Sequence, residues 1–209
     1  MALETPKPIS MMTKGRLEAF TDGVLAIIIT IMVLELKVPH GGTFEDLKPL
    51  LPVFGSYILS FIYIAIYWNN HHHMMQTVKH VTGKILWANM HLLFWLSLIP
   101  FVSGWMGENH FTTAGVFLYG IVLLGAAIAY FVLQFLIIKS HGKDSILSKA
   151  LGKDLKGKAS PILYIIGIIS AFFYVWISGF MFVFVAIIWL IPDKRIENKL
   201  KEERFKNSL

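Results

Sequence analysis

The feature that most constrains this chain is an apolar segment near its start, bracketed by two acids. Between Asp22 and Glu35 lie twelve residues, of which only Thr30 has a polar side chain. In a helix the two carboxylates would be about 20 Å apart along the axis, less than the roughly 30 Å of a bilayer's hydrocarbon core. At least one acid therefore lies inside the bilayer. An intramembrane acid must face protein or water, so it marks a candidate functional site.

The same segment carries a stripe of residues spaced three and four apart, which is one face of a helix. The stripe consists of Arg16, Phe20, Gly23, Ile27, Thr30 and Leu34. Ile31 flanks it, whereas Asp22 lies a third of a turn or more away. One interpretation is a packing seam between helices, but seams in lipid favour small residues. This stripe is mostly large and apolar around one hydroxyl, so a path between two aqueous faces is the alternative.

Composition predicts an all-α integral membrane protein. Hydrophobic residues make up 56% of the chain and charged residues 15%, and its Trp and Tyr residues suit membrane interfaces. The start, MALETPKPIS, lacks the apolar core of a signal peptide. No cysteine is present, which excludes disulfides and thiolate ligands. We expect a single domain over 1–209 with six transmembrane helices, at about 15–37, 50–70, 84–105, 112–138, 160–177 and 179–200.

The last two spans depend on charge, because the residues from Pro161 to Pro192 could form one helix or two. As one helix they would be about 45 Å long, too long for one span and short for two. Basic clusters flank them, with six Lys in 139–158 and six Lys or Arg in 194–206. A single crossing would place these clusters on opposite sides and violate the positive-inside rule.

Two crossings that turn near Ser178 and Gly179 keep both basic clusters in the cytoplasm. With six spans, both termini are cytoplasmic, and Lys37 and Lys48 are the only Lys or Arg outside. Membrane topology and anionic lipid then explain the net charge of +6, so no nucleic-acid partner is expected.

Three adjacent histidines, His71, His72 and His73, follow the second span. Consecutive helical positions point about 100° apart, so these rings cannot converge on one metal ion. We expect no metal site, and haem ligation by His72 and His91 lacks support elsewhere in the sequence. Three intramembrane polar residues are expected to join helices by hydrogen bonds: Asn89, His91 and Gln134.

Asp22 lies off the stripe, so we expect its carboxylate to be buried against neighbouring helices. A buried carboxylate needs hydrogen-bond donors. The candidate donors are Thr21, the His71–His72 pair and Asn89.

Several catalytic and channel motifs are absent: G-x-S-x-G, H-E-x-x-H, a P-loop, G-x-G-x-x-G and the T-V-G-Y-G filter. We therefore expect neither an enzyme nor a bound cofactor, and no carbonyl-lined potassium filter. Two rivals stay open: a cation transporter using Asp22 and Glu35, and a membrane redox protein using the His cluster.

The chain resembles the transmembrane protein 175 potassium channels over essentially its whole length. RLEAFTDGVLAIIITIMVLEL is similar to the family's R-x-x-x-F-S-D signature, and YWNNHH to its W-x-x-H-H. ANMHLLFWLSLIPF resembles the third span and WLIPDKRIE the closing motif. Three departures occur: Thr21 replaces Ser, His73 stands where Arg is common, and Ser103 stands where Thr is common.

The resemblance implies a homotetrameric potassium channel in the cell membrane, with the first helix of each subunit lining a central pore. It places a hydrophobic constriction at Ile27, Ile31 and Leu34, and assigns potassium preference to Thr30. Potassium is then the permeant ion, and membrane lipid the other partner. The family's packing network would comprise Arg16, Phe20, Thr21, Asp22, Trp68, His71, His72 and Asn89.

Overall fold

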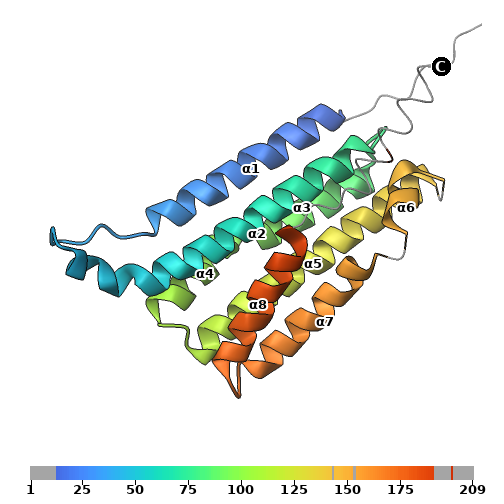
Figure 1. The fold of residues 1–209 in the computed structure, drawn as a ribbon. Coiled ribbons are helices and arrows are strands. Elements are labelled where there is room, and N and C mark those ends of the chain that lie inside the picture. The colour runs from blue at the N-terminus through green and yellow to red at the C-terminus, as the bar shows by residue number, and fades with distance from the viewer. Residues whose placement is uncertain (1–12, 143, 153, 191–198, 200–209) are drawn as a thin grey trace, which may run out of the picture.

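Figure 1 shows the computed structural model, which describes residues 13–142, 144–152, 154–190 and 199. All the regular secondary structure in this part of the chain is helical. The elements are α1 (Lys14–Leu34), a 3-10 helix η1 (Phe44–Leu50), α2 (Leu51–Gln76), α3 (Gly83–Ser97), α4 (Ile99–Glu108), α5 (Thr113–His141), α6 (Ile146–Leu151), α7 (Leu155–Ser170) and α8 (Val175–Leu190).

Four segments are long and apolar enough to cross a membrane: Lys14–Leu34, Phe44–Gln76, Gly83–Glu108 and Thr113–His141. They correspond to the first four predicted spans. The region of the last two predicted spans forms α7 and α8, each of 16 residues, which is about 24 Å of helix. The chain is therefore an all-α, multi-pass membrane protein with shorter helices at its C-terminal end.

The third predicted span, 84–105, is two helices and not one. The helical path is interrupted at Leu98, and α4 begins at Ile99 with Pro100 in its first turn. Proline has no N–H to donate to the preceding turn, and its ring clashes with that turn, so it ends α3. The two helices nevertheless form one membrane-spanning unit.

The turn between the last two helices lies at 171–174, earlier than the predicted turn near Ser178 and Gly179. Ser178 is instead inside α8 and completely buried. Small residues in membrane helices often mark close packing. The small residues Ser178 and Gly179 therefore pack inside α8 and do not form the turn. The sequence does not reveal the true turn, because the apolar composition continues unchanged through it.

The closing motif, WLIPDKRIE, and the last predicted span, 179–200, are only partly covered. Trp189 and Leu190 complete α8, and 191–197 of the motif lie outside the described residues.

The packing places α1 on one side of the bundle and α7 on the other (Figure 1). The central helix is α5, which packs against α3, α4, α7 and α8. Gly125 of α5 allows the Trp95 ring of α3 to lie directly on the helix backbone, where any Cβ would collide with it. By contrast, α1 packs only against α2, α3 and α4 among the closely packed described helices, so one of its sides is left open.

Candidate functional site

The first helix has two faces of different character. Its buried row, spaced four, four, three and four residues apart, comprises Leu17, Thr21, Leu25, Ile28 and Met32. Every residue of the predicted stripe is exposed, on roughly the opposite side of the helix. Ile27 is 60% exposed and Leu34 75% exposed. Within one subunit the stripe is therefore not a packing seam.

Thr30 is the one hydroxyl on the exposed apolar face between Gly23 and Leu34. Its Oγ1 donates to the carbonyl oxygen of Ala26, one turn earlier, at 2.9 Å. This local bond holds the side chain against its own helix. The hydroxyl oxygen keeps acceptor capacity, which faces away from the bundle and can serve a cation or water.

The buried face is fixed by a chain of hydrogen bonds across three helices. Asn89 Nδ2 of α3 donates to Thr21 Oγ1 of α1 at 2.9 Å, and His71 Nε2 of α2 lies 2.8 Å from Asn89 Oδ1. Because the amide oxygen is an acceptor, His71 must donate from Nε2. Asn89 has no exposed surface. The predicted role of Asn89 in joining helices is confirmed.

The expected partners of Asp22 are wrong. Its carboxylate accepts a bond from Trp68 Nε1 at 3.0 Å, whereas Thr21, His71 and Asn89 bond to one another. Asp22 is also exposed within the subunit, not buried. The cause is a one-residue difference in helical phase: Thr21 faces the bundle, and Asp22, about 100° further round, lies at its edge beside Trp68.

The three adjacent histidines diverge, as their helical spacing predicts. His71 is buried in the Asn89 network. His72 is exposed, stacks on Trp68 with ring centroids 6.0 Å apart, and bonds to Gln76 at 2.9 Å. His73 Nδ1 is enclosed without a hydrogen-bond partner among the described residues.

The other two polar residues expected to join helices do not do so. His91 accepts a bond from Trp95 of its own helix at 3.0 Å. Gln134 has no hydrogen-bond partner in the described part of the chain, and lines a pocket instead. Periodicity could not distinguish these environments, because it does not say which neighbour faces each residue.

Arg16 and Phe20, at the start of the stripe, are both exposed. Arg16 forms no ion pair with any residue that the structure describes. The family network predicted from the sequence is therefore divided. Within one subunit, its side-chain contacts form two groups: Thr21, Asn89 and His71, and Asp22, Trp68 and His72.

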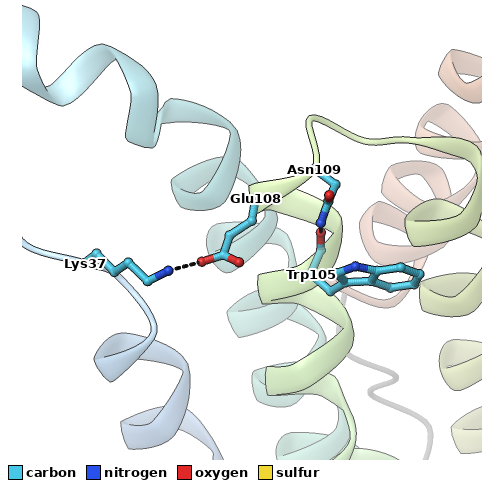
Figure 2. Close-up of polar contacts among 4 residues, drawn as sticks. All are labelled: Lys37, Trp105, Glu108 and Asn109. Atoms are coloured by element: carbon cyan, nitrogen blue, oxygen red, sulfur yellow. Dashed lines mark hydrogen bonds and ion pairs between the residues drawn. The ribbon is translucent and has the colours of Figure 1, made fainter.

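A second polar cluster, at the far end of α1, was missed by the sequence. Lys37 Nζ lies 2.6 Å from Glu108 Oε1 (Figure 2), joining the end of α1 to the end of α4. The hydrogen bond and the charge of Glu108 raise the pKa of Lys37. Beside the pair, Asn109 Nδ2 donates to the carbonyl oxygen of Trp105 at 2.8 Å and closes the end of α4 (Figure 2).

Glu35 lines an open cleft of about 360 Å³ between the ends of α1 and α4. Glu108 and Ile31 also line this cleft. The stripe therefore leads from Arg16 at one end of the helix to a cleft lined by two carboxylates at the other. Lys37 and Glu108 are 71 positions apart, and no local pattern in the sequence indicates their pairing.

Comparison with known proteins identifies a family model and several relatives that are similar to this chain. The family model described as "Endosomal/lysosomal potassium channel TMEM175" matches residues 16–100. A potassium channel of Chryseobacterium sp. (strain P1-3) is 59% identical over 191 residues, covering 91% of this chain and all of the relative. A potassium channel of Chamaesiphon minutus is 30% identical over 78% of this chain and 87% of its own length.

A solved structure is also similar. It is the crystal structure of a lysosomal potassium-selective channel TMEM175 homolog from Chamaesiphon minutus, with a TM-score of 0.76 and 28% identity. The match covers 86% of this chain and 97% of that one.

Proposed function

This chain belongs to the TMEM175 family of potassium channels, and we propose that it conducts potassium through a central pore lined by α1 of four identical subunits. The observation that carries the proposal is the exposed stripe of α1, which leaves a full side of this helix uncovered while hydrogen bonds on its buried side hold it against α3. A tetramer would turn the four stripes toward a common axis.

The narrowest part of this pore is formed by Ile27, Ile31 and Leu34. All three are exposed in the subunit and lie on or beside one face of the helix. Four copies of an aliphatic side chain at one level form a ring narrow enough to exclude water, and such a ring gates by dewetting. Conduction requires a wider state in which water enters.

Selectivity in this mechanism arises from hydration. Potassium loses part of its water shell at lower free energy than sodium, and the Thr30 hydroxyls with ordered water supply replacement ligands. Selectivity is modest compared with a carbonyl filter, because no backbone carbonyl ring replaces the full shell.

Arg16 lies on the stripe at the mouth opposite Glu35. A bare guanidinium there would repel permeant cations. In the assembled channel it pairs with an acid of a neighbouring subunit, Glu18 or Asp22, or turns aside from the axis.

The subunit crosses a cell membrane six times with both termini in the cytoplasm. Four crossings are the long apolar segments, and α7 and α8 supply two shorter ones that return the chain to the same side. The basic cluster in 139–158 then lies on the cytoplasmic side with the start of α1, as the positive-inside rule requires.

Potassium flux into vesicles reconstituted with the purified protein tests the function. We expect flux above that of empty vesicles and resolvable unitary currents in a planar bilayer. A cation transporter using Asp22 and Glu35, the rival function, would give flux without unitary currents. Crosslinking in mild detergent tests the assembly, and a stable monomer would contradict the central pore.

A further inference from the structure

A small pocket lies between α2, α5 and the C-terminal helices, away from α1 and the stripe. Its wall is mostly aromatic and includes Tyr63, Tyr67, Tyr130, Phe131, Tyr164 and Trp189. The open space is about 40 Å³, enough for about three water molecules. A large ligand is therefore excluded by size.

Two polar side chains in this wall lack partners. Gln134 of α5 is 7% exposed and Tyr67 of α2 is 8% exposed, and neither forms a hydrogen bond with any residue that the structure describes. Inside a membrane protein such groups are unfavourable unless something satisfies them. In the described part of the chain, the polar side-chain atoms that are both sealed and unpaired belong to His73 and Ser178. The unpaired polar atoms of Gln134 and Tyr67 therefore keep some accessible surface. Both residues line the pocket.

The other polar groups of the wall are already satisfied. The Tyr63 hydroxyl donates to the carbonyl oxygen of Phe182 at 2.6 Å, and the Tyr130 hydroxyl to that of Asn70 at 3.3 Å. Ser160 Oγ accepts a bond from Trp189 at 2.8 Å and donates to its own helix. The Tyr164 hydroxyl lies beside that of Tyr63, and the two rings have centroids 6.3 Å apart. The polar side chains of the wall with no hydrogen-bonding neighbour among the described residues are therefore Gln134 and Tyr67.

The chemistry of the pair specifies the ligand. A carboxamide and a phenol each donate and accept, and both are neutral. Asp154, the acid in the wall, accepts a bond from the backbone N–H of Gly157. The group that complements Gln134 and Tyr67 is small and neutral, and it both donates and accepts hydrogen bonds. A hydroxyl group has these properties. We propose that this pocket is a binding site for neutral hydroxyl groups, supplied by ordered water or by a short-chain primary alcohol, which bridge Gln134 to Tyr67.

Such a bridge would join α2 to α5 beside the hydrogen bond from Tyr130 to Asn70. The Tyr67 and Tyr130 rings meet edge to face, with centroids 6.0 Å apart. The site is independent of the proposed pore, so its test does not use ion conduction.

Radiolytic footprinting of the assembled protein in lipid tests whether ordered water occupies the pocket. Ordered water exposed to a brief X-ray pulse yields hydroxyl radicals that oxidise adjacent side chains. We expect Tyr67 to be oxidised faster than Tyr119, which is fully enclosed, bonded to Ser60 at 3.0 Å and outside the pocket. Gln134→Leu removes one hydrogen bond of the bridge, so oxidation of Tyr67 should fall about fivefold.

The matched control is Tyr57→Phe, which removes a phenol from α2 outside the pocket and should leave Tyr67 oxidation unchanged. Gel filtration and thermal melting verify that each variant is folded. Adding methanol, which fits the space, distinguishes the two sources. Because alcohols also scavenge hydroxyl radicals in solution, the rate of Tyr67 is taken relative to that of Tyr174, which is exposed and outside the pocket. A lower ratio shows that the alcohol replaces water, and an unchanged ratio shows that water alone is the ligand. The proposal is overturned if Tyr67 is oxidised no faster than Tyr119, or if folded Gln134→Leu leaves its rate unchanged.

Discussion

The two faces of α1 differ in burial and in hydrogen bonding, although they belong to one helix and have similar apolar composition. On the buried face, Thr21 is held by Asn89, and Leu25 is 3% exposed. On the stripe face, Ile27 is 60% exposed and Thr30 bonds only to its own helix among the described residues. The buried face positions the helix, and the stripe face is left uncovered within the subunit, where the proposed channel would place the ion path.

This division explains why polar groups are distributed as they are. The amide network on the buried face is neutral, so it can be placed in a low-dielectric interior without burying a charge. Two charged side chains avoid the buried face: Asp22 lies beside it on α1, and Lys37 lies just after the end of the helix. Both are exposed. Mutations on the two faces should therefore separate stability from permeation.

The largest expected effect is on the buried face, from Asn89→Leu. The substitution leaves Thr21 and His71 without partners, at about 1–3 kcal/mol for each unsatisfied group. We expect a lower melting temperature in detergent and loss of assembly. His91→Leu is the control, because it removes a polar side chain of the same helix whose bond is local. Equal stability of the two variants would contradict the positioning role.

A matched pair of truncations sharpens the comparison. Leu25→Ala and Ile27→Ala remove aliphatic atoms two positions apart on opposite faces. Leu25→Ala should lower stability because it leaves a cavity, with conductance retained. Ile27→Ala should widen the ring and raise single-channel conductance or weaken selectivity, with little change in melting temperature. Parallel truncations at Ile31 and Leu34 extend the test. If all three stripe variants conduct and select as the parent does, the stripe is not the constriction.

Asp22 lies between the two faces, and Asp22→Ala tests which one it belongs to. Its removal leaves the Trp68 indole N–H without its acceptor, at about 1 kcal/mol for a partly exposed bond. We expect weaker tetramer assembly on crosslinking, with ion preference unchanged in the channels that form. Normal assembly with loss of cation selectivity would instead place Asp22 in the ion path.

Thr30→Val changes the stripe face without changing its shape. The hydroxyl is lost and the fold is retained, so potassium preference over sodium should fall about fivefold, as for the loss of about 1 kcal/mol of coordination. Reversal potentials in mixed potassium and sodium solutions measure this. Thr30→Ser, which keeps the hydroxyl, should preserve the preference.

The smallest effect is expected from Lys37→Gln, which removes the ion pair with Glu108. Both side chains are well exposed, at 75% and 45%, and exposed pairs contribute about 0.2–1 kcal/mol. Thermal melting of Lys37→Gln, Glu108→Gln and the double variant, at low and high salt, gives the coupling free energy between the two side chains. A coupling that is large and independent of salt would show that this end of α1 is as firmly held as the buried face.

The sequence by itself determined the membrane class, the first four spans and the stripe. These follow from apolar length and from three- and four-residue spacing, which are properties of a single helix. Motif resemblance to a known family added the residues that gather around Thr21 and Trp68. Their pairing was predicted incorrectly, because resemblance identifies which residues matter and not which atoms meet.

The tertiary structure decided what depends on contacts between helices. It assigned Trp68 to Asp22 and Asn89 to Thr21, placed the last turn at 171–174, and paired Lys37 with Glu108 across 71 positions. It also left Gln134 facing a pocket, where the sequence predicted a bond to another helix. Periodicity fixes the direction of a side chain around its own axis. The rotation and depth of the neighbouring helix decide which group that side chain meets.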